Sequence, residues 1–167
     1  MKIRSMKKSD LNVLSKIYVE VYRVFDVGEK WTQKSAYNLL NFWFNRQPDL
    51  CFVAEYKNKI VGAFVTYIKP WSDGNHLIAE EIFVDPLYQK HGIGTELTKK
   101  IFQKAIIDYN AKIVEGITFS KFKHPLSWYK SLGFKEVKEW VVISGDIKKA
   151  LKILQDKQPK FPLKPWD

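Results

Sequence analysis

One stretch of the chain, from residue 77 to residue 119, constrains the fold more than any other. Residues 77–84 form an apolar run of strand length, residues 93–109 carry apolar side chains at helical spacing, and residues 112–119 form a second apolar run. Two strands joined by a helix pair in parallel, with a right-handed crossover. The sequence therefore predicts a βαβ unit and places the chain in the α/β class.

The part of the chain that precedes this unit has a different pattern. Residues 50–56 and 60–68 are strand-like runs joined by the polar turn Lys57-Asn58-Lys59, which predicts an antiparallel pair. A short first strand is expected at residues 2–4, and a loop around Pro70 is expected to lead to the strand of residues 77–84. Amphipathic helices are expected after Ser9 and Thr32, since both can cap a helix and apolar residues follow them at helical spacing.

The C-terminal part is expected to hold a short helix that begins near Pro125 and ends at Gly133, a last strand at residues 139–144 and a helix at residues 147–154. A proline-rich tail closes the chain. With 167 residues, 46% of them hydrophobic, one core suffices. We expect a single domain over residues 1–145, to which the helix and tail of residues 146–167 also belong.

Charge and targeting signals limit the function. The net charge is +10, and residues 89–138 carry 10 basic and 4 acidic side chains, so an anionic partner is expected near this segment. A nucleic acid and a polyphosphate cofactor are both compatible with that excess. No apolar run has the length of a membrane span, and Met1 to Arg4 lack a signal-peptide core, so we expect a cytoplasmic protein without membrane contact.

Cysteine and histidine side chains offer little chemistry. Cys51 is the single cysteine and lies between Leu50 and Phe52, which predicts a buried and inert strand position. The three histidines show no spacing typical of metal ligands, so no metal is predicted.

Two glycines lie between the strand of residues 77–84 and the helix of residues 93–109. Gly92 and Gly94 allow the backbone to direct successive N–H groups inward, and the N-terminus of the helix adds partial positive charge. This geometry favours a pyrophosphate. The spacing differs from that of a P-loop and from the three-glycine dinucleotide fingerprint.

The sequence Gln89-Lys90-His91-Gly92-Ile93-Gly94 resembles the acetyl-CoA loop of the GNAT superfamily of N-acetyltransferases. The preceding Val84-Asp85-Pro86-Leu87-Tyr88 and the later Trp128 to Phe134 occur in the order of that family, so the resemblance spans roughly residues 3–145. It implies a mixed, mostly antiparallel sheet with a central parallel βαβ pair, flanked by helices on both faces.

The resemblance also implies acetyl-CoA as co-substrate, bound by backbone groups of the strand end and by the loop. The residues concerned are Ile82, Phe83, Val84, Gln89, Lys90, His91, Gly92, Ile93, Gly94 and Thr95.

The chemistry of amine acetylation needs a base for the amine proton and an acid for the leaving thiolate. Tyr129 resembles the family's tyrosine beside the cofactor sulfur and is the expected acid, although a core aromatic would look the same. Glu80 resembles the glutamate that serves diamine (polyamine) acetyltransferases, and Glu81 is the reserve candidate. Strand alternation places these two on opposite faces, with Glu80 on the face of Ile82 and Val84. Both glutamates could instead be solvated.

The expected function is transfer of an acetyl group from acetyl-CoA to a primary amine, on a small molecule or a peptide, by direct attack in a ternary complex. A homodimer is a further expectation, and no nucleic-acid partner is expected. Two other interpretations remain: a nucleic-acid-binding module that uses the basic surface, for which the lysines are scattered, and a CoA-binding sensor without catalysis.

Overall fold

The computed structural model describes residues 1–155. The proline-rich tail lies outside the described residues. The chain divides into two units, Met1–Thr118 and Phe119–Asp167, which are considered separately below. The assignment of both units to one domain stays a prediction.

The first unit is built around one mixed sheet. Its strands are β1 (Lys2–Ser5), β2 (Cys51–Tyr56), β3 (Lys59–Trp71), β4 (Gly74–Val84) and β5 (Ala111–Gly116), which lie side by side in that order. All neighbours are antiparallel except β4 and β5, which are parallel. The mostly antiparallel sheet with a parallel βαβ pair is confirmed, and within the described residues that pair lies at one end of the sheet.

The turn residues explain the β2–β3 hairpin, whereas the β3–β4 hairpin differs from the prediction. Lys57 and Asn58 have positive φ angles of 48° and 62°, the conformation of a two-residue turn whose twist matches its strands. The β3–β4 hairpin is longer than expected, because Pro70 pairs with Asn75 and Trp71 with Gly74. Pro70 was expected in a loop; it is accommodated because it stands near the end of its strand.

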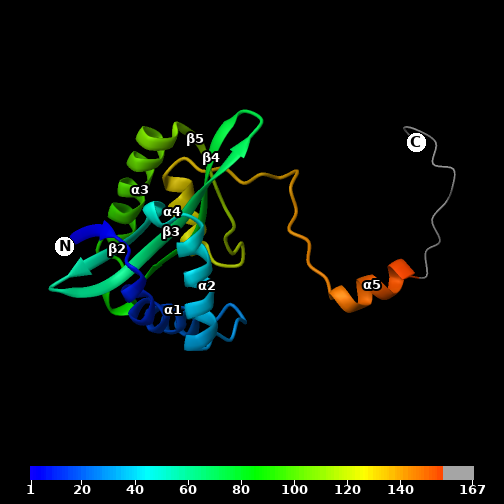
Figure 1. Cartoon of the computed structure of the whole chain (residues 1–167), viewed down its shortest axis with the longest axis horizontal. Helices are drawn as coiled ribbons and strands as arrows, with labels where there is room; N and C mark the ends of the chain where they lie inside the picture. Colours follow the sequence, from blue (N-terminus) through cyan, green and yellow to red (C-terminus); the bar gives the residue numbers. More distant parts are fainter. Residues whose placement is uncertain (156–167) are drawn as a thin grey trace. The chain divides into compact units, whose positions relative to one another are not determined.

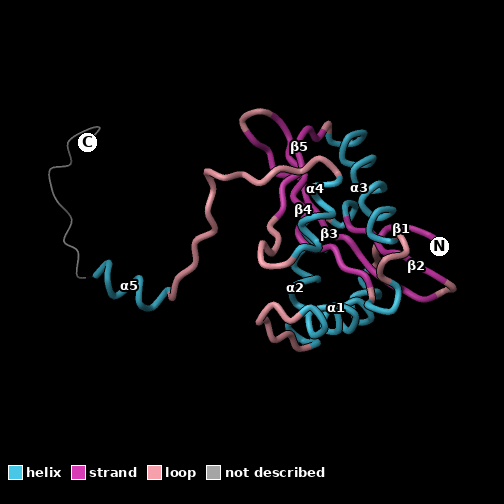
Figure 2. Tube along the Cα trace, turned by 180° about the vertical axis from the view of Figure 1, so that it is seen from behind, coloured by secondary structure: helices cyan, strands magenta, loops and turns pink. Residues whose placement is uncertain are grey.

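Helices cover both faces of this sheet (Figures 1 and 2). On one face, α1 (Leu11–Phe25) and α2 (Gln33–Arg46) pack against the strands through a buried apolar cluster that includes Leu14, Tyr18 and Phe83. On the other face, α3 (Ile93–Tyr109) packs through a second cluster that includes Leu97 and Ile101. The bounds of α3 agree with the sequence prediction. Short 3₁₀ turns occupy Lys8–Asp10, Pro48–Leu50 and Pro86–Tyr88.

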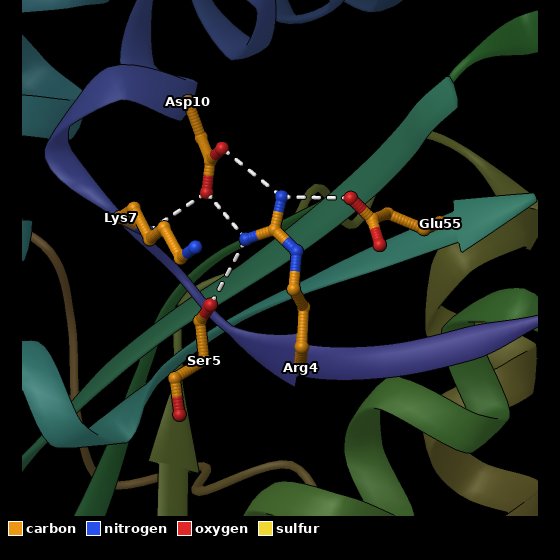
Figure 3. A network of polar contacts seen from close by, with 5 residues as sticks. All are labelled: Arg4, Ser5, Lys7, Asp10 and Glu55. Carbon is orange, nitrogen blue, oxygen red and sulfur yellow. Dashed lines mark hydrogen bonds and ion pairs between the residues drawn. The ribbon is translucent and has the colours of Figure 1, made fainter. Parts of the chain in front are cut away.

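A polar network joins the first strand to the start of α1 (Figure 3). The Arg4 guanidinium donates to the Asp10 carboxylate at 2.7 Å and to Glu55 of β2 at 2.9 Å, and Asp10 also accepts the Lys7 N–H. Burial opposes ionisation of Asp10, but the bonds from Arg4 and Lys7 hold its pKa below the usual range. The network fixes β1 against β2, at the end of the sheet opposite β5.

The second unit contains α4 (Lys123–Ser131) and α5 (Ile147–Gln155). The predicted strand at residues 139–144 is wrong: this segment has no strand pairing in the structure, and Trp140 to Ile143 are exposed. Its β-branched side chains favour a strand, but a strand also needs a partner, and the segment has none among the described residues. No helix in residues 1–155 combines the length and apolarity needed to cross a bilayer.

Candidate active site

The backbone of β4 has an open edge just before the glycine loop. The parallel register between β4 and β5 ends where Ala79 pairs with Gly116, so within the described residues Glu81 to Val84 have a strand partner on the β3 side only. The Asp85 N–H bonds to the Val61 carbonyl of β3 at 2.8 Å. Because successive backbone groups along a strand point to opposite edges, the Val84 N–H points toward the open edge.

A β-bulge interrupts β4 at Glu80. Val65 pairs with Glu81 and Thr66 with Ala79, which leaves Glu80 without a partner on β3. Such an insertion shifts the alternation of side chains by one residue. The predicted placement is therefore wrong: Ile82 packs on the α3 side of the sheet, whereas both glutamates lie toward the side of α1 and α2.

Glu81 is enclosed by aromatic side chains from α1. Its carboxylate accepts a hydrogen bond from the Tyr22 hydroxyl at 3.2 Å, and Phe83, two residues along β4, is 3% exposed and packs against Tyr18. Burial raises the pKa of Glu81 to about 7; the hydroxyls of Tyr18 and Tyr22 oppose this rise, while the charges of Glu80 and Glu29 add to it. A carboxyl group with this pKa can exchange protons at neutral pH.

Glu80 has a different environment. Burial raises its pKa as well, but the positive charge of Arg46 opposes the rise. Arg46 is the last residue of α2, and its guanidinium lies 4.0 Å from the centre of the Tyr67 ring. The Arg46 charge favours the ionised form but does not offset burial, so the pKa of Glu80 stays raised.

The loop after β4 is held by its own polar groups. The Asp85 carboxylate accepts the Leu87 N–H, and the Gln89 side-chain amide donates to the Val84 carbonyl at 2.9 Å. His91 donates from its Nδ1 to the Gln89 carbonyl at 2.7 Å. Gln89 and His91 thus fix the loop backbone in addition to being exposed donors.

The start of α3 has the features of an anion site. Gly92 is the N-cap residue, with φ of 78°, and no side chain caps the helix. The N–H groups of the first turn, from Ile93 to Thr95, therefore have no acceptor within the helix. A Cβ atom on Gly92 would meet nothing within 4 Å, so the space beside it is open. Lys90 is exposed next to it, which suits a diphosphate.

Ile93 contributes to this site through its backbone alone. Its side chain is 5% exposed and belongs to the cluster between α3 and the sheet. Phe83 is likewise a core residue of the α1 side. The structure therefore brings the predicted cofactor residues of β4, the loop and the first turn of α3 together in one unit, with backbone groups as the main donors.

Tyr129 belongs to the second unit. It lies near the end of α4, half-buried, with its ring centre 5.0 Å from that of Trp128 and 5.3 Å from that of Phe134. Its carbonyl accepts the Phe134 N–H, which closes the turn after α4. This packing is that of an aromatic anchor, and the catalytic role of Tyr129 stays a prediction.

Other predicted positions have clear places. Cys51 is fully buried, as predicted, and burial raises the pKa of its thiol to about 12. Among the described residues, no group of three or more potential metal ligands is found.

Tyr18 and Tyr22 are the residues that sequence reasoning missed. Both lie in the helix expected after Ser9, where they continue the stripe of Leu11 and Leu14 at a spacing of four residues. That spacing was a usable signal. A hydroxyl at the end of a buried stripe needs a polar partner, and here the partner is Glu81.

Comparison with known proteins gives a consistent picture. The model of the acetyltransferase (GNAT) family matches residues 11–134. An uncharacterized N-acetyltransferase of Methanocaldococcus jannaschii is 35% identical over 83% of this chain and 64% of its own length, so the chain spans less than two thirds of that relative. One from Archaeoglobus fulgidus is 30% identical over 69% of this chain and 80% of its own length.

A solved structure from Pyrococcus horikoshii superposes on this chain with a TM-score of 0.70 at 27% identity. The match covers 86% of this chain and 92% of the solved chain. These names specify no amine, so the likeness to diamine acetyltransferases stays a prediction. Because the family model matches residues 11–134, which are most of this chain, and the sheet has the same architecture with a glycine loop between β4 and α3, the chain belongs to the GNAT acetyltransferase family.

Proposed function

We propose that this protein transfers an acetyl group from acetyl-CoA to a primary amine by direct attack within a ternary complex. The observation that carries the proposal is the placement, within one unit, of an open β4 edge, an uncapped helix N-terminus and a partly buried glutamate of raised pKa. A long thioester with a diphosphate fits the first two features, and the deprotonation of an amine fits the third.

Acetyl-CoA is assigned to β4 and the loop. The open edge at Ile82 to Val84 offers backbone donors and acceptors to the pantetheine amides. The first-turn N–H groups of α3 and the side chain of Lys90 would bind the diphosphate. This assignment explains why Gly92 faces open space.

Glu81 is the proposed base. An amine with a pKa near ~10 is protonated at neutral pH and must lose its proton before the nitrogen attacks the carbonyl carbon. Glu81, with a pKa of about 7, can receive that proton directly or through water. As the C–N bond forms and the C–S bond breaks, the Val84 N–H is directed at the developing oxyanion. Tyr129 is the proposed proton donor to the leaving thiolate; the second proton, which the nitrogen loses as the amide forms, passes to solvent, from which Tyr129 is reprotonated.

The acceptor is proposed to be a small-molecule or peptide amine. Glu29 and Glu80 add negative charge around Glu81, which favours a cationic molecule over a nucleic acid at this position. The expectations of a cytoplasmic location and of a homodimer stay predictions.

Thiol release from acetyl-CoA tests the function, with the purified chain and panels of polyamines, aminoglycosides, amino acids and lysine peptides. We expect Glu81→Gln to lower kcat about 10²- to 10⁴-fold, the usual contribution of a general base. Glu80→Gln, its neighbour, should lower kcat much less, and Tyr129→Phe should lower kcat more than it weakens CoA binding.

The alternatives give different results. Tight CoA binding without release on any amine would favour the sensor. A fully active Glu81→Gln variant would remove Glu81 from the mechanism, and an unchanged kcat in Tyr129→Phe would remove Tyr129.

A further inference from the structure

We infer that Tyr22 of α1 is a positioning residue that holds the Glu81 carboxylate in the orientation and charge state needed to accept the amine proton. The inference rests on the proposed function of Glu81 as base. It adds to that function a residue from a different element, 59 positions away in the sequence.

The Tyr22 hydroxyl reaches Glu81 across the gap between α1 and β4. The oxygen atoms are 3.2 Å apart, and the hydroxyl donates because the carboxylate can only accept. The Tyr22 ring is itself fixed, since it stacks on Tyr18 at 4.5 Å between centres and meets Trp31 edge-on at 6.1 Å. A ring held on two sides gives its hydroxyl one direction, toward β4.

This hydrogen bond and the neighbouring Tyr18 hydroxyl act against burial and against the nearby negative charges. Burial favours the neutral acid, and the nearby charges of Glu80 and Glu29 favour it as well. A donated hydrogen bond stabilises the carboxylate, which is the form that takes up a proton. Without Tyr22, a smaller fraction of Glu81 would be available as a base at neutral pH.

Tyr18 also acts on Glu81 and is therefore not a neutral control. It lies one helical turn before Tyr22, is fully buried, and its hydroxyl lowers the pKa of Glu81 as the Tyr22 hydroxyl does. Tyr109, the last residue of α3, provides the matched control, because its hydroxyl donates to the Asp49 carboxylate. Tyr109→Phe removes a bond of the same kind in the same unit and leaves Glu81 untouched.

The test combines carbon-13 NMR titration of the Glu81 carboxyl with the pH profile of kcat/KM in the full-length chain. Tyr22→Phe should raise both the Glu81 midpoint and the acid limb of the profile by about one pH unit, the effect of losing a hydrogen bond to a charged group. Tyr109→Phe should leave both unchanged, and thermal unfolding verifies that each variant is folded.

The two measurements separate the inference from the function on which it rests. If the Glu81 midpoint moves while the acid limb does not, Tyr22 positions a group that the reaction does not use, and Glu81 is not the base. If neither moves while Glu81→Gln is inactive, Glu81 is the base and the role of Tyr22 is refuted. In the unsubstituted protein, the Tyr22 Cζ resonance should titrate with the Glu81 midpoint; a flat Tyr22 response would also refute the inference.

Discussion

Two glycines in the loop before α3 have different reasons to be glycine. Gly92 has φ of 78°, where a side chain is strained by about 1–2 kcal/mol. Gly94 has no positive φ, and a Cβ atom there would meet only the Ile82 side chain, at an ordinary 3.8 Å. The protein itself does not require glycine at position 94, so a ligand that approaches the backbone is the better explanation.

Gly94→Ala should separate binding from folding. We expect the free energy of unfolding to stay the same or rise by about 0.5–1 kcal/mol, because alanine favours a helix. CoA affinity should fall about tenfold or more, which corresponds to ~1.4 kcal/mol, since the added methyl group lies in the approach path of the diphosphate. Calorimetry with CoA and denaturant unfolding measure the two effects.

Gly145→Ala is the control for this substitution. A Cβ atom on Gly145 would meet nothing within 4 Å, and Gly145 lies outside the segment of β4, loop and α3 that is assigned to CoA, so the same change there should leave CoA affinity unaltered. Unchanged affinity in Gly94→Ala would place the diphosphate elsewhere. Gly92→Val should also block CoA, but its backbone strain makes it the less selective variant.

At the scale of elements, the sequence predicted structures that depend on one segment alone, such as a helix or a turn. It did not predict structures that depend on how two strands pair. The bounds of α3 and the turn at Lys57 and Asn58 follow from the apolar spacing and the turn residues. The bulge at Glu80 leaves no mark in the alternation of its own strand, because it arises from the register with β3. The face of each glutamate was therefore beyond sequence reasoning.

The junction between β5 and the β3–β4 hairpin contains a second titratable cluster. His76 of β4, 4% exposed, contacts Glu115 of β5 through Nδ1 and Asp73 of the hairpin turn through Nε2, at 2.7 Å for the latter. Lys69 of β3 donates to Glu115 at 2.8 Å. Both ring nitrogens face carboxylates, so the charged imidazolium satisfies both contacts.

This cluster should make stability depend on pH. The bond to Glu115 raises the pKa of His76, burial opposes the rise, and the bond to Asp73 adds to it. Because the folded pKa lies above the unfolded value near ~6.5, the stabilisation is complete below that value and is lost as pH rises through the folded pKa. We expect the unfolding temperature of the unsubstituted protein to fall as pH rises through the folded pKa of His76. The unfolding temperature of His76→Gln should fall less over the same pH values. Equal pH slopes in both proteins would contradict this role.

At the scale of the whole molecule, the chain contains more strand-forming sequence than the sheet uses. Trp140, Val141, Val142 and Ile143 have high strand propensity, yet the segment has no strand partner within residues 1–155. The family match also ends at residue 134, before this segment. The residue types indicated that this segment can form a strand, but they could not indicate which other strand it would pair with.

The distribution of charge could be predicted from sequence, and it has a consequence for the whole protein. The excess of basic residues in positions 89–138 includes Lys90 beside the N-terminus of α3. Salt screens such charges, with a Debye length of about 10 Å at 0.1 M and less at higher salt. CoA affinity should therefore fall about tenfold between ~0.02 and ~0.5 M NaCl, as measured by calorimetry.

Pantetheine is the matched ligand for this measurement, since it keeps the thiol arm and lacks the phosphates. Its weaker affinity should change little with salt, because the β4 edge offers it neutral backbone groups. An equal salt response of both ligands would mean that the basic residues do not act through the phosphates. Duplex DNA bound more tightly than CoA at every salt concentration would turn the assignment of this surface toward nucleic acid.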